Sequence, residues 1–307
     1  MYIVHYTLII MDNVYHIPAM LQETIEGLAI KPQGVYVDVT FGGGGHSRAM
    51  MEYLQDGGHL FSFDQDADAL QNAIDDPKWT FVHSNFRYLR NWMDYYGVEQ
   101  IDGLLADLGV SFHHFDCPER GFSFRFSAPL DMRMNQTAKR TAADIVNGYS
   151  EEELAKIFFL YGELKNGRGI AKNICKARSQ KPIERTEDLV AASRIPAEMS
   201  KELARLFQAL RIEVNDEMGA LRDMLVAARD LLKPGGRIAI LTYHSLEDRL
   251  VKNFLRSGNL EGTIEKDFYG NNLSPFTLIE KGREASAEEV ERNPRARSAK
   301  LRVAEKR

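Results

Sequence analysis

Cysteines are scarce in this 307-residue chain, which holds only Cys117 and Cys175. Neither has a second cysteine nearby, so the sequence has no C-x-x-C clip for a metal ion, and we expect two reduced, buried thiols. No apolar run reaches the roughly 20 residues that a membrane-spanning helix requires. The first residues also lack the basic stretch and small-residue cleavage site of a secretory signal. The sequence therefore predicts a cytoplasmic protein with no metal site and no membrane partner.

The chain also lacks an excess of positive charge. Its formal net charge is −5 at pH 7, with 44% hydrophobic and 27% charged residues. These proportions are ordinary for a globular protein, and the net charge alone predicts no nucleic-acid partner. Cations are nevertheless concentrated in residues 162–178, where Glu163 is the only acid, and in residues 292–307, where Glu305 is the only acid. Such patches bind phosphates without reading sequence, although a solvated face is the plainer interpretation.

Short runs rich in β-branched and aromatic residues alternate with helical patterns through the first part of the chain. Strands are predicted at 34–41, 59–64, 79–83 and 101–107, with helical segments from about residue 46, over 67–74 and over 87–96. Strands separated by helix-length segments indicate βαβ units and a parallel sheet. The fold class is therefore α/β.

The alternation stops near residue 135 and resumes near residue 213. Between them, Ser150 and Glu153 form a capping-box pattern before an amphipathic run, and no strand pattern is present. We predict a helical insertion at 136–212 within one discontinuous domain, residues 12–135 and 213–307. The second part reads as a helix ended by Lys-Pro-Gly-Gly at 233–236, a fifth parallel strand at 237–243, and final strands at 276–280 and 301–304.

Four consecutive glycines, Gly42 to Gly45, follow the first predicted strand. Glycine permits positive φ angles and lets a ligand approach the backbone closely, which is typical of a nucleotide or nucleoside site at the carboxyl end of a sheet. A tight structural turn is the plainer alternative. Asp64 ends the second strand about 20 residues later, where a carboxylate can accept hydrogen bonds from both ribose hydroxyls.

The spacing of the glycines helps to separate the possible cofactors. Ser47 stands where the dinucleotide fingerprint G-x-G-x-x-G would have its third glycine, and the G-K-[ST] ending of a phosphate-binding loop is absent. An adenosyl ligand without a pyrophosphate, S-adenosylmethionine, fits better than NAD. The pattern alone still leaves an NAD-dependent oxidoreductase open.

Six motifs in unbroken order resemble the MraW/RsmH family. They are Tyr-His-Ile-Pro at 15–18, Asp-Leu-Gly-Val-Ser at 107–111, Arg-Gly-Phe-Ser-Phe at 120–124, Pro-Leu-Asp-Met-Arg-Met at 129–134, His-Ser-Leu-Glu-Asp-Arg at 244–249 and Asn-Pro-Arg-Ala-Arg-Ser-Ala-Lys-Leu-Arg at 293–302. The resemblance covers residues 15–307. It implies a class I (Rossmann-like) methyltransferase sheet with a helical insertion for substrate recognition. It also implies methyl transfer from S-adenosylmethionine to the exocyclic N4 amine of a decoding-centre cytidine in 16S rRNA, within the small ribosomal subunit.

By the same resemblance, seven positions contact the cofactor. They are Gly44, Gly45, His46, Asp64, Phe86, Asp107 and His114. Position 114 departs from the family pattern, which usually has glutamine there. A histidine can replace glutamine as a donor or as an acceptor, but not as both in one neutral tautomer.

Two residues are predicted to act on the reacting groups. Transfer from a sulfonium is an in-line displacement, for which alignment supplies roughly 7–11 kcal/mol. Asp107 keeps the acid of the Asp/Asn/Ser-Pro-Pro-aromatic motif of DNA aminomethyltransferases, without the Pro-Pro-aromatic part. We predict that it accepts a hydrogen bond from the amine or from the cofactor; capping of the turn is the alternative. His244 is predicted to take the proton or to stack on the base, or else to be satisfied by neighbouring backbone.

Aromatic and cationic residues also interleave after the fourth predicted strand, at Phe122, Phe124, Arg125, Phe126 and Arg133. This pattern suits stacking on an unpaired base that has left its helix, although ordinary core phenylalanines would look similar. Four functions stay open at this point: the RNA methyltransferase, the same chemistry on another RNA or on DNA, an NAD-dependent oxidoreductase, and a non-catalytic RNA-binding protein. The last would need neither the four glycines nor Asp64.

Overall fold

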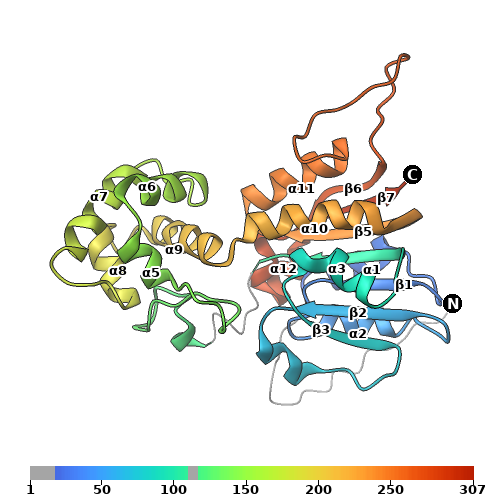
Figure 1. Cartoon of the computed structure of the whole chain (residues 1–307), viewed down its shortest axis with the longest axis horizontal. Helices are drawn as coiled ribbons and strands as arrows, with labels where there is room; N and C mark the ends of the chain where they lie inside the picture. Colours follow the sequence, from blue (N-terminus) through green and yellow to red (C-terminus); the bar gives the residue numbers. More distant parts are fainter. Residues whose placement is uncertain (1–17, 110–116) are drawn as a thin grey trace.

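Seven strands form one sheet in the computed structural model, which describes residues 18–109 and 117–307 (Figure 1). The strands are β1 (Val35–Asp38), β2 (His59–Asp64), β3 (Trp79–His83), β4 (Ile101–Asp107), β5 (Leu232–Thr242), β6 (Phe276–Glu284) and β7 (Lys300–Lys306). Their order is β3-β2-β1-β4-β5-β7-β6. The first five are parallel, and β7 is antiparallel to both of its neighbours. The strand order reverses between β1 and β4, and ligands of open α/β sheets bind at the carboxyl ends of the strands beside such a switch.

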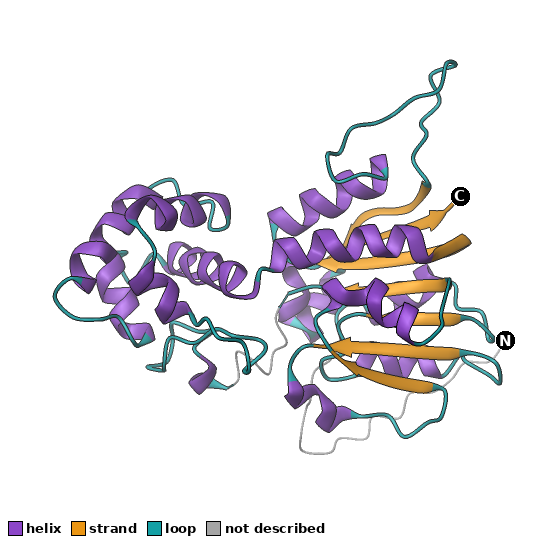
Figure 2. Cartoon of the chain, viewed as in Figure 1, coloured by secondary structure: helices purple, strands orange, loops and turns teal. Residues whose placement is uncertain are grey.

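Helices cover both faces of the sheet (Figure 2). One face carries α1 (Leu21–Leu28) and α2 (Gly45–Met51); the other carries α3 (Leu89–Tyr95), α10 (Glu217–Leu231) and α11 (Ser245–Ser257). Neighbouring residues of a central strand enter different cores: Leu104 packs with the α10 side, whereas Leu105 packs with the α1 side. Burial on both faces explains why the central strands read as nearly continuous apolar runs.

A separate helical part is inserted between β4 and α10, and the carboxyl ends of the parallel strands face it (Figure 1). Its helices are α5 (Ala142–Gly148), α6 (Glu151–Leu160), α7 (Gly167–Arg178), α8 (Thr186–Ser193) and α9 (Ser200–Asn215). The predicted capping box of Ser150 and Glu153 starts α6. No strand is assigned between residues 136 and 212, all of which are described.

The helical part has its own core, which also takes four residues from before the predicted start of the insertion. These are Phe122, Leu130, Met132 and Met134. They belong to the segment that leads from β4 into the helices, so this segment packs with the insertion rather than with the sheet. The boundaries 12–135, 136–212 and 213–307 remain predictions.

The α/β fold class is confirmed, and β2, β3 and β4 have the predicted bounds. Three expectations need correction. Residues 67–74 contain the 3-10 helix η1 (Ala67–Asn72) rather than an α-helix: the Ala69 N–H donates to the Asp66 carbonyl and the Ala73 N–H to the Leu70 carbonyl, each three residues back. Lys-Pro-Gly-Gly at 233–236 lies inside β5, where a register shift pairs Leu232 with Ile101. Both cysteines are partly exposed.

Both cysteines are free thiols, as expected, and the position of Cys175 shows why the expectation of burial was wrong. The buried stripe of α7 is formed by Ile170, Ala171 and Ile174, and Cys175 lies beside that stripe at the margin of the helical core.

Among the described residues, no helix has both the length and the apolar character to cross a bilayer.

Candidate active site

A cavity of about 920 Å³ opens where the strand ends face the helical part. The sheet side contributes the glycine turn, the ends of β2 and β4, and the start of η2 (Phe86–Tyr88). The helical side contributes residues 122–126 and α9. Ligand pockets usually measure about 300–1,000 Å³, so this volume can hold a cofactor together with part of a second molecule.

The glycine turn forms the floor of this cavity and leads into α2. Gly42 and Gly44 have φ angles of 50° and 76°, which glycine adopts without steric cost. Gly44 is the N-cap of α2. A Cβ on Gly45 would lie 2.9 Å from Cγ of Pro18, so the chain is also too close here for a side chain. The turn therefore exposes backbone, rather than side chains, to the cavity.

Asp64 ends β2 at the rim of the cavity. Its Oδ2 accepts a hydrogen bond from the Gly42 N–H at 2.8 Å, and its Oδ1 accepts one from the Asp66 N–H at 2.9 Å. Two backbone donors thus fix the carboxylate in orientation. A carboxylate is an acceptor with about four lone-pair sites, so Asp64 at the rim of the cavity can accept a hydrogen bond from a ligand hydroxyl.

Ser47, which interrupts the dinucleotide fingerprint, has a structural task. Its hydroxyl donates to Oδ2 of the buried Asp38 at 2.6 Å and lies 2.8 Å from the Ser62 hydroxyl. Burial raises the pKa of the Asp38 carboxyl, and the Ser47 hydrogen bond opposes this rise. Asp38 Oδ1 in turn accepts from the Thr40 N–H at 3.0 Å. A third glycine at position 47 would remove the donor that satisfies this carboxyl.

Asp107 ends β4 at the centre of the cavity wall. Its Oδ1 accepts a 2.7 Å hydrogen bond from the Tyr243 hydroxyl, and its backbone N–H donates to the Thr40 hydroxyl at 2.6 Å. Burial raises the pKa of Asp107 to about 7, against the lowering effect of the Tyr243 bond. Burial and the neighbouring Asp107 raise the pKa of Tyr243 well above its usual value, so its hydroxyl remains a donor.

His46 faces the second oxygen of Asp107. Its Nε2 lies 3.1 Å from the carbonyl oxygen of Ala19, and its Nδ1 lies 3.6 Å from Asp107 Oδ2. A carbonyl only accepts, so Nε2 carries the proton. Burial lowers the pKa of His46 and favours the neutral ring. The lone pair of Nδ1 then points toward Asp107, which is consistent with a carboxyl whose pKa is raised.

His244 lines the cavity and is the N-cap of α11. Its Nδ1 accepts from the Glu247 N–H at 3.4 Å. Its buried Nε2 lies 3.1 Å from Glu247 Oε1, but no hydrogen bond of good geometry joins them among the described residues. Backbone therefore satisfies Nδ1 alone, whereas Nε2 faces the Glu247 carboxylate, and neither predicted role of His244 is tested by these contacts.

Glu217, His244 and Glu247 place potential metal-ligand atoms within 4.8 Å of one another. Two contacts argue against a metal ion there. Because Nδ1 of His244 accepts a hydrogen bond, the proton of a neutral ring lies on Nε2, which then has no lone pair for a metal. Both oxygens of Glu217 accept from Arg211 at 2.8 Å. Glu217 pairs with Arg211, and His244 faces Glu247, so these residues form two separate pairs rather than one metal site.

The aromatic wall divides into buried and accessible rings. Phe122 is 4% exposed and packs in the helical core, whereas Phe126 is 48% exposed at the cavity. Phe124 lies edge-on to Phe207 of α9, with ring centroids 5.6 Å apart. Arg125 lines the cavity, but Arg133 is engaged by Asp131 through a 2.6 Å contact.

The structure brings most of the predicted site residues together. Gly45, His46, Asp64, Phe86, Asp107 and His244 line the cavity, and Gly44 lies in the same turn. His114 lies outside the described residues. Sequence reasoning missed the bond between Tyr243 and Asp107, and it missed Arg120, whose side chain holds Asp66 beside Asp64. The only sequence signal for Arg120 was its place in the 120–124 motif.

The family and the curated relatives that this chain resembles match nearly its whole length. Residues 13–307 match the model of the MraW methylase family. The chain is 59% identical over 300 residues to ribosomal RNA small subunit methyltransferase H of Parabacteroides distasonis, covering 96% of this chain and 98% of the relative. It is 57% identical over 296 residues to the protein of the same name from Bacteroides thetaiotaomicron, covering 95% and 97%. A solved structure of a putative rRNA methylase from Clostridium thermocellum has a TM-score of 0.45 at 13% identity, covering 95% of this chain and 100% of that one.

Proposed function

The chain belongs to the MraW methylase family, and from this premise we propose that it transfers a methyl group from S-adenosylmethionine to the N4 amine of a decoding-centre cytidine in 16S rRNA. The observation that carries the proposal is the shared cavity. Asp64, the glycine turn and Asp107 line it from the strand ends, and the aromatic segment 122–126 lines it from the side of the helical part. The relatives' name, ribosomal RNA small subunit methyltransferase H, supports rRNA of the small subunit as substrate.

The residues present fit the adenosyl part of this donor. Gly42 and Gly43 line the cavity, and a Cβ on Gly42 would meet only the Thr40 carbonyl oxygen at 4.0 Å, so a ligand can approach the backbone of this turn. Asp64, held by two N–H groups, accepts hydrogen bonds from the ribose hydroxyls. Phe86 supplies an apolar surface at the same end of the cavity. S-adenosylmethionine supplies an electrophilic methyl group on a sulfonium; the protein's task is to orient it.

In this proposal Asp107 acts on the cytosine amine. Its Oδ1 is engaged by the Tyr243 hydroxyl, so Oδ2 is the atom that accepts a hydrogen from the amine. Accepting that hydrogen favours localisation of the nitrogen lone pair, which is otherwise delocalised into the ring. A pKa of about 7 leaves a substantial carboxylate fraction at neutral pH.

His244 contacts the base in this proposal. Because one ring nitrogen caps α11 and the other faces Glu247, a second proton on the ring would displace the cap. These contacts favour stacking on the base over removal of its proton. The exposed ring of Phe126 offers a second stacking surface for a base that has left its helix.

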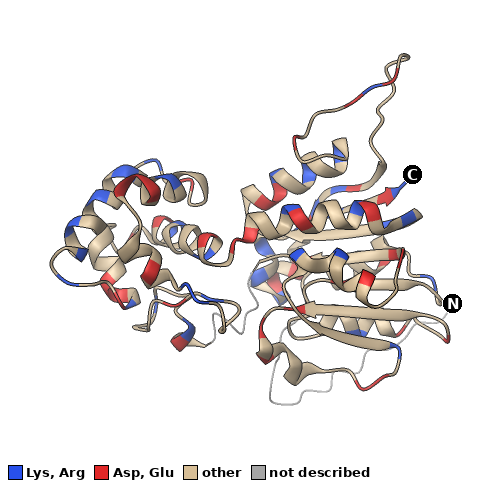
Figure 3. Cartoon of the chain, viewed as in Figure 1, with Lys and Arg blue, Asp and Glu red and all other residues tan. Residues whose placement is uncertain are grey.

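The surface charge favours α7 as the phosphate-binding face. Figure 3 shows Lys and Arg gathered on this helix, and Lys165, Arg168, Lys172 and Lys176 are exposed at its start and along it. The cations of residues 292–307 are more often paired: Arg292 with Glu289, Lys300 with Glu284 and Arg302 with Asp248. We therefore propose that the helical part recognises the substrate. The partner in this proposal is the small ribosomal subunit in the cytoplasm.

Mass spectrometry of digested 16S rRNA tests this function. In a strain that lacks the gene, we expect loss of one N4-methylcytidine, restored by the wild-type gene and not by an Asp64→Ala variant. An unchanged set of methylcytidines in 16S rRNA would contradict the substrate. Calorimetric titration with S-adenosylhomocysteine and with NAD separates the cofactors, and binding of NAD alone would contradict the methyltransferase.

A further inference from the structure

Arg120 is a charged residue buried outside the lining of the cavity. It ends the 3-10 helix η3 (Pro118–Arg120), in the segment between β4 and the helical part. Its side chain is 10% exposed, and that of its partner Asp66 is 6% exposed. A buried charge is costly unless it is paired and hydrogen-bonded, so its contacts indicate what the burial achieves.

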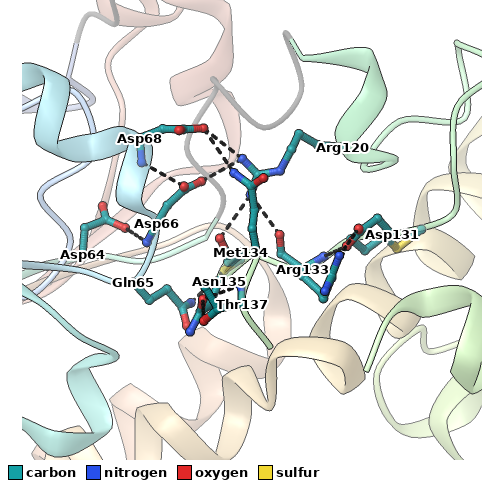
Figure 4. Close-up of polar contacts among 12 residues, drawn as sticks. Asp64, Gln65, Asp66, Asp68, Arg120, Asp131, Arg133, Met134, Asn135 and Thr137 are labelled. Atoms are coloured by element: carbon teal, nitrogen blue, oxygen red, sulfur yellow. Dashed lines mark hydrogen bonds and ion pairs between the residues drawn. The ribbon is translucent and has the colours of Figure 1, made fainter. Parts of the chain in front are cut away.

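The guanidinium reaches across to the sheet and also binds its own segment (Figure 4). Nη1 donates to Asp66 Oδ2 at 3.0 Å and to Asp68 Oδ2 at 3.3 Å. Nη2 donates to the carbonyl oxygens of Arg133 and Met134 at 2.9 and 3.1 Å. The planar donor fork of arginine suits these simultaneous contacts, which a lysine could not reproduce.

On the sheet side, the chain of contacts ends at Asp64. Arg120 fixes the side chain of Asp66, and the backbone N–H of Asp66 donates to Asp64 Oδ1 at 2.9 Å. Arg120 is therefore two contacts away from the carboxylate to which we assign the ribose, without touching the cavity itself.

On the helical side, the same guanidinium positions the aromatic wall. Its Cζ lies 5.9 Å from the centre of the Phe122 ring, and Phe124 and Phe126 follow in the same segment. Met134, whose carbonyl Arg120 binds, lines the cavity. One side chain thus holds both the rim of the ribose site and the segment that faces the substrate.

We propose that Arg120 is a positioning residue that builds the donor site and the acceptor wall as one unit, so that its loss weakens binding of both substrates. The proposal rests on the proposed role of Asp64 as the ribose ligand. No contact of Arg120 with either substrate is required. The expected signature is a rise in Kd for S-adenosylhomocysteine and a rise in KM for RNA together.

The test compares three variants by calorimetric titration with S-adenosylhomocysteine in the absence of RNA. Arg120→Lys keeps the charge and loses the fork. Arg120→Met with Asp66→Asn removes both charges while keeping the Asp66 backbone donor, which avoids an unpaired buried carboxylate. Arg237→Met is the matched control, because Arg237 also joins a carboxylate (Glu305) and a carbonyl (Gly27) but lies away from the cavity.

We expect the Kd to rise about tenfold or more for both Arg120 variants, and to stay within twofold of wild type for Arg237→Met. KM for RNA should rise in the same two variants. A folded double variant with wild-type Kd would overturn the proposal, as would a rise in Kd without a rise in KM for RNA. An Asp64→Ala variant in the same titration distinguishes failure of this proposal from failure of the proposed function. If that variant binds S-adenosylhomocysteine as wild type does, the assignment of Asp64 as the ribose ligand is refuted.

Discussion

Replacing Tyr243 with phenylalanine removes one hydroxyl from the site without changing its shape. In the structure that hydroxyl donates to Asp107 Oδ1 at 2.7 Å, and the hydrogen bond favours the ionised carboxyl. Burial already raises the pKa of Asp107 to about 7. The variant therefore removes a contact that opposes this rise, and we expect the pKa of Asp107 to increase further.

The size of the increase follows from the strength of the bond. A hydrogen bond to a charged group contributes about 1.5–3 kcal/mol, and one pKa unit corresponds to about 1.4 kcal/mol, so the pKa rises by about one to two units. In the role that we propose for Asp107, the carboxylate is the active form. It exists above the pKa, so activity is lost as pH falls through the pKa. At pH 7 the active fraction drops from about one half to between about one tenth and one hundredth, a loss of about five- to fiftyfold.

The assay is a pH profile of kcat/KM from pH 5.5 to 9.5, with small subunits from the deletion strain as substrate. Wild type should lose activity below about pH 7. Tyr243→Phe should lose activity one to two pH units higher, and its kcat/KM should recover at high pH. Tyr36→Phe is the control, since the Tyr36 hydroxyl binds the Lys31 N–H away from the cavity. The reasoning fails if the acidic limb stays in place, or if Tyr243→Phe has no activity at any pH.

Three further predictions address other parts of the molecule. Lys165→Ala with Lys172→Ala should weaken RNA binding across sequences and reduce the slope of log K against log salt by about 0.7–0.9 for each lost phosphate contact. Lys31→Ala, at an exposed lysine, is the control and should change neither the affinity nor the slope. An unchanged slope in filter binding with the double variant would show that α7 is not part of the RNA interface. Arg211→Met should lower the free energy of unfolding by about 3–5 kcal/mol, because Glu217, whose side chain is only 12% exposed, would lose its cation. Urea denaturation that shows a loss of less than 1 kcal/mol would contradict this. Gly44→Ala should cost about 1–2 kcal/mol in the same measurement because of its φ of 76°, and a neutral result would show that the turn relaxes.

The sequence was sufficient for elements whose signal is local. β2 and β4 are short apolar runs bounded by polar residues, and their predicted bounds are correct. The glycine turn and Asp64 were also found, because close backbone approach and a strand-end carboxylate leave clear residue patterns. The resemblance of six motifs to the MraW/RsmH family agrees with the match over residues 13–307.

What the sequence missed depends on contacts between distant residues. Tyr243 and Asp107 are 136 positions apart, and Arg120 and Asp66 are 54 apart, so no spacing rule relates them. The strand β5 was predicted to begin at residue 237 because Lys-Pro-Gly-Gly resembles a helix stop. Pairing of Leu232 with Ile101 extends the strand through those residues, and this pairing depends on the neighbouring strand.

Asn215 joins the two chain segments through which the helical part is attached. Its side chain accepts from the Met134 N–H and donates to the Met132 carbonyl, both at 2.8 Å, at the point where α9 meets α10. The incoming and outgoing segments are thereby tied into a single narrow neck beside the cavity. Together with the contact of Arg120 with Asp66, this tie holds the helical part against the sheet and so helps to set the width of the opening that a bulky polynucleotide must enter.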